Sequence, residues 1–115
     1  MNIEDVRYYA LSLPGATEDM PYGPDVLVFR IGGKIFLHLW LNAPSPSCAV
    51  KLPPDQGEEL RATNAAIAPA WHLNKRHWND LFLDHLPDNL VRNLIDTSHH
   101  LVLSKLPKAL RATLV

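Results

Sequence analysis

The chain has 115 residues, of which 47% are hydrophobic, and its 11 lysines and arginines and 12 aspartates and glutamates give a formal net charge of −1. This length predicts one domain over residues 1–115, and its apolar content can fill a core without metal or disulfides, which argues against disorder. The near-neutral charge argues against a DNA-binding protein that is basic all over, so a nucleic-acid site would have to be local.

The cysteine content and the apolar pattern also indicate a cellular location. The single cysteine, Cys48, excludes an internal disulfide and is typical of a reducing compartment. The first residues do not resemble a secretory signal, and no stretch approaches the ~18 apolar residues that a membrane span needs. We therefore expect a cytoplasmic protein that does not enter the membrane.

Apolar residues recur at helix and strand spacings along the chain. Ile3, Val6 and Ala10 repeat at helical spacing near the start, and Pro14-Gly15 ends that helix. In chain order we expect a helix over 3–13, strands over 26–31, 34–41 and 47–52, a short helix over 53–64, strands over 67–73 and 78–83, and a long helix from 87 to about 105. Residues 108–115 are expected to form one further turn or to fray.

Short turns between the strands predict the fold class. Gly32-Gly33 is a two-residue hairpin signal, and residues 74–77 are expected to join the last two strands. Runs of strands connected in this way, with helices around them, predict an α+β protein. We expect a two-layer fold with a five-stranded antiparallel sheet packed by three helices, in the order α-β-β-β-α-β-β-α.

Four segments of the chain resemble a known family. They are residues 13–15 together with 21–25, residues 28–36, residues 72–79 and residues 104–107. These segments resemble the bacterial YjbR/MmcQ family of small proteins, and the run Asn-Lys-Arg-His-Trp at 74–78 is the most specific match. The resemblance implies a fold like that of secretion chaperones, a proposed binding of DNA through a "double wing" of two hairpins, and no known catalytic residues.

Both predicted hairpins carry polar and basic side chains that suit contacts with phosphates, sugars and bases. The candidate nucleic-acid-binding residues are Asn74, Lys75, Arg76, His77 and Asn79 at one hairpin, and Arg30 and Lys34 at the other. The alternative is that both are ordinary solvated turns, with Trp78 in the core and Asn74 in a special turn conformation.

The strand over 34–41 presents a second candidate surface. Its alternate residues Phe36, His38 and Trp40 are expected to lie opposite the core face, where an exposed aromatic row would bind a protein partner or a second copy of the chain. The alternative is that the last helix, the loop at Tyr22 or a dimer covers them.

Reactive side chains do not form a recognisable catalytic or metal-binding pattern. The six histidines lack the regular spacing of a metal site, and Cys48 is expected to be buried with its neighbours on one strand rather than activated by His38. No metal and no small-molecule cofactor is implied. We therefore expect a non-catalytic binding protein, with DNA as the first candidate partner and a protein or a second copy of the chain as the alternative.

Overall fold

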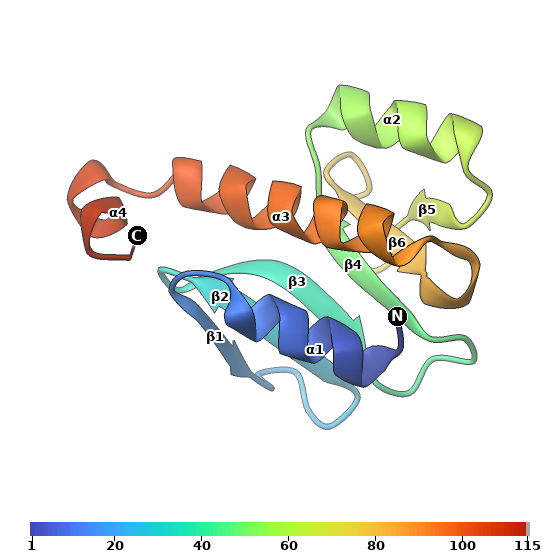
Figure 1. The fold of residues 1–115 in the computed structure, drawn as a ribbon, viewed down its shortest axis with the longest axis horizontal. Helices are drawn as coiled ribbons and strands as arrows, with labels where there is room; N and C mark the ends of the chain where they lie inside the picture. Colours follow the sequence, from blue (N-terminus) through green and yellow to red (C-terminus); the bar gives the residue numbers. More distant parts are fainter. Residues whose placement is uncertain (115) are drawn as a thin grey trace.

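The computed structural model describes residues 1–114 and has an α+β fold built on one antiparallel sheet, with α1 and α3 lying side by side across one of its faces (Figure 1). In chain order the elements are α1 (Ile3–Ser12), β1 (Ala16–Asp19), β2 (Val26–Ile31), β3 (Lys34–Trp40), β4 (Ser47–Lys51), α2 (Pro54–Thr63), β5 (Ile67–Pro69), β6 (Trp78–Phe82), the 3-10 helix η1 (Leu83–His85), α3 (Asp88–Ser104) and α4 (Lys108–Leu114). The strand order is β1-β2-β3-β4-β6-β5. The α+β class and the antiparallel sheet are confirmed, whereas the sheet has six strands rather than five.

The sequence analysis was wrong about three elements. Strand β1 occupies a region expected to be a loop, because its four residues are too few for an alternating pattern and it is held by pairing with β2. Strand β5 ends at Pro69 instead of continuing to residue 73, as expected of a proline that cannot donate a ladder hydrogen bond. Residues 108–114 form a helix, α4, which makes four α-helices rather than three.

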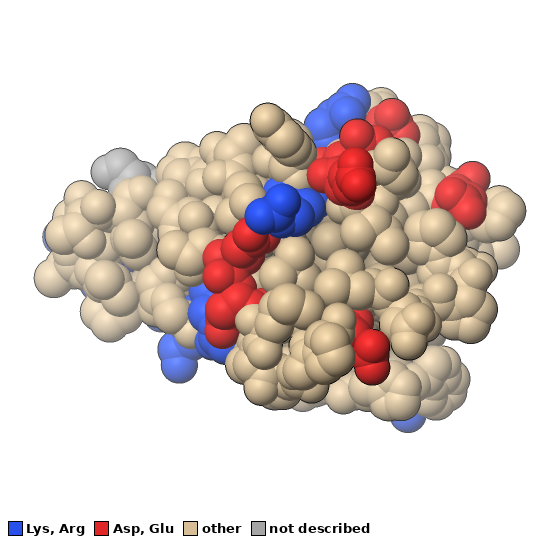
Figure 2. All heavy atoms as spheres, turned by 90° about the horizontal axis from the view of Figure 1, so that it is seen from below, with Lys and Arg blue, Asp and Glu red and all other residues tan. Residues whose placement is uncertain are grey.

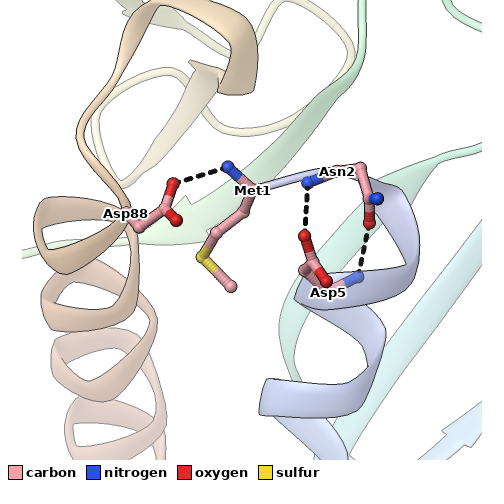
Figure 3. Close-up of polar contacts among 4 residues, drawn as sticks. All are labelled: Met1, Asn2, Asp5 and Asp88. Carbon is pink, nitrogen blue, oxygen red and sulfur yellow. Dashed lines mark hydrogen bonds and ion pairs between the residues drawn. The ribbon is translucent and has the colours of Figure 1, made fainter.

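The start of the chain holds α1 and α3 together (Figure 3). The side chain of Asn2 accepts a hydrogen bond from the Asp5 backbone N–H at 2.8 Å, and the Asp5 carboxylate accepts one from the Asn2 N–H at 3.0 Å. This reciprocal capping box satisfies N–H groups that a helix start leaves unpaired. The Met1 amine then donates to Asp88 at 2.7 Å, which places the first turn of α3 beside that of α1.

The core lies between the sheet and these helices. The predicted grouping of Cys48, Val50 and Leu52 on one face is confirmed, and all three are fully buried. From α3 the buried side chains are Val91, Leu94, Ile95, Ser98, His99 and Val102.

A β-bulge corrects the predicted faces of β3. The β2–β3 register pairs Phe29 with Leu37 but Arg30 with Ile35, so Phe36 is an extra residue. Phe36 is fully buried in the core, where its ring lies edge-on to His99 at 5.1 Å. The expectation that Phe36 lies on the face opposite the core is therefore wrong, because a regular alternation cannot reveal a one-residue shift.

Next to the bulge, a helix side chain replaces a sheet hydrogen bond. The β3–β4 ladder ends at Leu37 and Val50, so the next pair would be Phe36 and Lys51. Instead, the buried Ser98 hydroxyl of α3 donates to the Phe36 carbonyl at 2.5 Å and accepts from the Lys51 N–H at 2.9 Å. The hydroxyl thereby ties α3 to both strands at the point where their pairing stops.

Candidate nucleic-acid interface

Both candidate hairpin connections lie at the same end of the sheet. Gly32 and Gly33 have φ values of 57° and 82°, the conformation that a two-residue primed turn requires at both positions. β3 runs away from this turn, β4 runs back toward it and ends at Lys51, and Lys51 pairs with Trp78 at the start of β6. The connection over 70–77 therefore approaches the same edge as the Gly32-Gly33 turn.

A groove of about 580 Å³ lies between these connections and the end of α3. It is lined by Arg30, Gly33, Lys34, Ile35, Lys51, Trp78, Val102, Lys105, Leu106 and Pro107. We call this set of residues the basic groove. Four of its side chains are basic, and the lining, which is known for the described residues 1–114, contains no aspartate or glutamate.

The charges of the basic groove are only partly neutralised. Arg30 forms an ion pair with Asp19 at 2.8 Å, and hydrogen bonding to this carboxylate raises the pKa of Arg30. Lys34, Lys51 and Lys105 have no ion-pair partner within residues 1–114. Partial burial, followed by the charge of Lys105, lowers the pKa of Lys51, as expected where like charges share a site.

The same positive field reaches the neighbouring loop. Desolvation lowers the pKa of His77, and the charges of Lys51, Arg76 and Lys105 lower it further. A bound anion would relieve this mutual repulsion.

Other parts of the surface are electrically mixed. Figure 2 views the molecule from the side on which α1 and β1 lie in Figure 1, and it shows acidic and basic groups next to one another rather than a field of one sign. Within β1, Glu18 pairs with Arg7 while Asp19 pairs with Arg30. This interleaving explains how a chain of net charge −1 has a locally basic groove.

Asn74 shapes the loop over 70–77. Its side-chain oxygen accepts from the Arg76 N–H at 3.1 Å, and its carbonyl accepts from the N–H groups of His77 and Trp78. No non-glycine residue of the described chain has a positive φ, so the special backbone angle expected at Asn74 is absent. Its structural role is instead an Asx-type turn.

The tip of this loop presents an aromatic ring together with cations. The Lys75 ammonium lies 4.0 Å from the centre of the Trp71 ring, and 69% of Trp71 is exposed. Lys75 and Arg76 are both exposed. Exposed rings next to cations suit the stacking and phosphate contacts of nucleic-acid binding.

Asn79 does not belong to this surface. It is fully buried, its amide oxygen accepts a hydrogen bond from Arg61, and its amide nitrogen donates to the His77 carbonyl at 3.2 Å. We therefore remove Asn79 from the candidate interface. Its position in a strand, two residues after the turn, did not reveal which face it occupies.

Two contributing lysines were missed by the sequence analysis. Lys51 ends β4 and Lys105 follows the last turn of α3, so neither stands near a hairpin in the sequence. A signal was available for Lys51, since it alternates with the core residues Val50 and Leu52 and must point to the other face. Lys105 had no comparable signal, because its position depends on how α3 crosses the sheet.

Of the two possibilities left open for the sheet face opposite the helices, an exposed aromatic row or a covered one, burial holds for His38. Only 4% of His38 is exposed, and its ring stacks on Trp40 at 5.6 Å and meets Trp78 edge-on at 4.8 Å. Burial, together with the charge of Arg30, lowers the pKa of His38 to about 4. Binding of a protein partner at Phe36, His38 and Trp40 stays a prediction, but Phe36 cannot take part from the core.

The expected burial of Cys48 is confirmed, and burial raises the pKa of its thiol. Cys48 pairs with Leu39, one position from His38, so the two side chains lie on opposite faces of the sheet. Within residues 1–114 no three histidine, cysteine, aspartate or glutamate side chains are grouped to hold a metal ion. Over the same residues, no helix has the length and apolar character needed to cross a membrane.

Comparisons with known proteins identify a matching family and two similar bacterial proteins. The YjbR family model matches residues 11–101. The uncharacterized protein YjbR of Escherichia coli K12 is 28% identical over 116 residues, covering 100% of this chain and 98% of the relative. The uncharacterized protein YbdF of Escherichia coli O157:H7 is 33% identical over 106 residues, covering 91% and 87% of the two chains.

Two crystal structures share the fold. A Deinococcus radiodurans protein with a DUF419 domain matches with a TM-score of 0.90 and 33% identity, covering 98% of this chain and 87% of that one. A Pseudomonas syringae protein matches with a TM-score of 0.78 and 27% identity, covering 89% and 99%. The YjbR family model matches most of the sequence, and relatives of 28% and 33% identity align over most of their own length, so this chain belongs to the YjbR family.

Proposed function

We propose that the chain is a non-catalytic protein that binds duplex DNA through the basic groove and the adjacent loop over 70–77. The observation that carries this proposal is the set of three lysines, Lys34, Lys51 and Lys105, which converge on one groove without an acidic side chain in its lining. Phosphate neutralisation supplies most of the affinity of non-specific DNA binding. Three lysines that line one groove and have no ion-pair partner within residues 1–114 suit that role better than the mixed surface around β1.

The geometry also agrees with a mode of binding that uses two hairpins. The Gly32-Gly33 turn and the loop over 70–77 flank the groove from the same end of the sheet. Trp71, exposed beneath Lys75, supplies a ring that can contact a sugar or base. Thiol catalysis by Cys48 and His38 has no support, because the thiol is buried and the two side chains lie on opposite faces of the sheet.

Salt-dependent affinity tests the proposal. Binding of a short fluorescein-labelled DNA duplex would be followed by anisotropy for the wild type and for the triple variant Lys34→Gln, Lys51→Gln, Lys105→Gln. Each lost phosphate contact reduces the log–log salt slope by about 0.9, so the triple variant should have a slope about 2.7 smaller in magnitude. Glutamine keeps the β and γ methylenes of each lysine and ends in an uncharged polar group, so folding should be preserved.

A matched control lies on the same helix as Lys105. Arg92 is exposed on α3 and lines a different cavity beside α1, so Arg92→Gln should leave both affinity and salt slope unchanged. Lys75→Ala with Arg76→Ala measures the contribution of the loop separately. The proposal fails if the wild type does not bind duplex DNA at low salt, or if the triple variant binds with the same affinity and slope.

A further inference from the structure

A second, larger cleft lies on the sheet face that α1 and α3 leave uncovered. Its volume is about 780 Å³, within the range of roughly 300–1,000 Å³ typical of small-molecule sites. Aromatic side chains from three parts of the chain line it, namely Tyr22, Trp40 and Phe82. We call it the aromatic cleft, and its lining residues do not include any of those that line the basic groove.

The register of the sheet explains why this face is hollow. Two rows of paired residues cross β3, β4 and β6, and they are Trp40–Ser47–Phe82 and His38–Ala49–Asp80. In both rows the central strand contributes a small side chain and its neighbours contribute larger ones. Directly paired residues of adjacent strands lie on the same face, so the small side chains leave a trough along β4.

Two polar groups of the row His38–Ala49–Asp80 lack hydrogen-bond partners within residues 1–114, and the one on His38 is itself buried. Asp80 accepts one hydrogen bond, from the Trp40 indole N–H at 2.9 Å, and its second carboxylate oxygen has no donor within residues 1–114. Nδ1 of the nearly buried His38 also has no partner among these residues. Burial raises the pKa of Asp80, and the Trp40 hydrogen bond and the charge of His72 offset this only in part.

Apart from the imidazoles of His38 and His72, the ionisable groups of the lining are acidic. Asp25 joins Asp80 in the aromatic cleft, and neither lysine nor arginine is among the described residues that line it. Aromatic faces and carboxylates together favour cations over anions, because ring faces and carboxylate oxygens both carry negative charge. A planar group fits a trough walled by the rings of Trp40 and Phe82.

We propose that the aromatic cleft binds a small aromatic cation, a planar ring that bears an amidinium or a protonated amine. Its N–H groups would donate to the free oxygen of Asp80, while its ring packs against Trp40. The site is distinct from the basic groove, whose charge selects anions, and it does not depend on DNA binding.

Benzamidine is a suitable probe, with benzamide as its neutral counterpart and benzoate as its anionic one. Titrations would be followed by the NMR shift of the Trp40 indole N–H, which donates to Asp80 and so reports on this carboxylate. Benzamidine should saturate the signal at concentrations up to roughly 10 mM, as expected of a ligand this small. It should bind at least tenfold more tightly than benzamide or benzoate. Methylguanidine, which carries the charge without the ring, should bind at least tenfold more weakly than benzamidine.

Asp80→Asn is the test variant, because asparagine keeps an acceptor for Trp40 at nearly the same volume while removing the charge. It should weaken benzamidine binding at least tenfold, whereas Asp84→Asn, an exposed residue in η1 outside the cleft, should leave binding unchanged. The inference is overturned if benzamidine does not bind, if benzamide, benzoate or methylguanidine binds equally well, or if Asp80→Asn binds as tightly as the wild type.

Discussion

Ser98→Ala should destabilise the protein by about 2–5 kcal/mol, although it removes only one oxygen atom. The lost hydroxyl leaves two groups without partners, the Phe36 carbonyl and the Lys51 N–H, and each buried unsatisfied group costs about 1–3 kcal/mol. The β3–β4 ladder has already ended at this point, so the two strands cannot re-pair without moving. The higher helix propensity of alanine offsets only about 0.5 kcal/mol.

Urea unfolding followed by tryptophan fluorescence would measure this loss, with an unchanged m-value as the check that the transition is still two-state. For a chain of this size, about 2–5 kcal/mol corresponds to a melting temperature lower by roughly 8–20 °C. Ser104→Ala is the matched control, because this exposed hydroxyl donates only to the Leu101 carbonyl of its own helix. Equal stabilities of the two alanine variants would refute the idea that Ser98 joins the strands.

Two further predictions concern pH and the hairpin turn. The pKa of His38 falls from 6.5 to about 4 on folding, so between these pH values the unfolded chain binds more protons than the folded one. As the pH falls from 6.5 to 4, this group should lower the free energy of unfolding of the wild type by about 3 kcal/mol. His38→Phe should lose that much less stability over the same range, as urea titrations at each pH would show. Gly33→Ala should lower the free energy of unfolding by about 1–2 kcal/mol, because its φ is positive, although a Cβ there would meet no other atom. Gly32→Ala should cost at least about 1 kcal/mol more, because its Cβ would lie 2.6 Å from the Leu106 side chain. Urea midpoints of the two variants would measure the difference.

Either result could contradict its reasoning. An identical pH dependence in His38→Phe and the wild type would mean that the imidazole is not held neutral by burial. Equal losses in the two glycine variants would mean that the Leu106 contact relaxes without cost and that only backbone strain matters.

Much of the fold could be predicted from local patterns. The Gly32-Gly33 turn, the stripe of α3 and the alternation in β4 each depend on neighbouring residues, so the sequence carries them directly. Features set by distant contacts could not be read in the same way. β1 exists because β2 pairs with it, and His99 is buried beside Phe36 and the Pro14 carbonyl.

The candidate site was predictable in part for the same reason. Lys34 and Arg76 lie at turns that the sequence predicts. In the structure Lys34 lines the basic groove, and Arg76 lies in the adjacent loop, where its charge acts on His77 together with those of Lys51 and Lys105. Lys51 and Lys105 lie close together only because α3 crosses the sheet. Phe36 lies in the core, and not on the face of His38 and Trp40, only because β3 contains a bulge. Both are tertiary effects without a signature in the residues themselves.

The two outer strands of the sheet have consequences for self-association. Each edge exposes backbone groups that could template another strand, which is a common route to aggregation. On β1, the neighbouring acids Glu18 and Asp19 are each held by an arginine, and on the three-residue β5 a proline occupies the last position. Charged side chains protect the β1 edge and a proline protects the β5 edge, so strand-to-strand addition of a second copy is disfavoured.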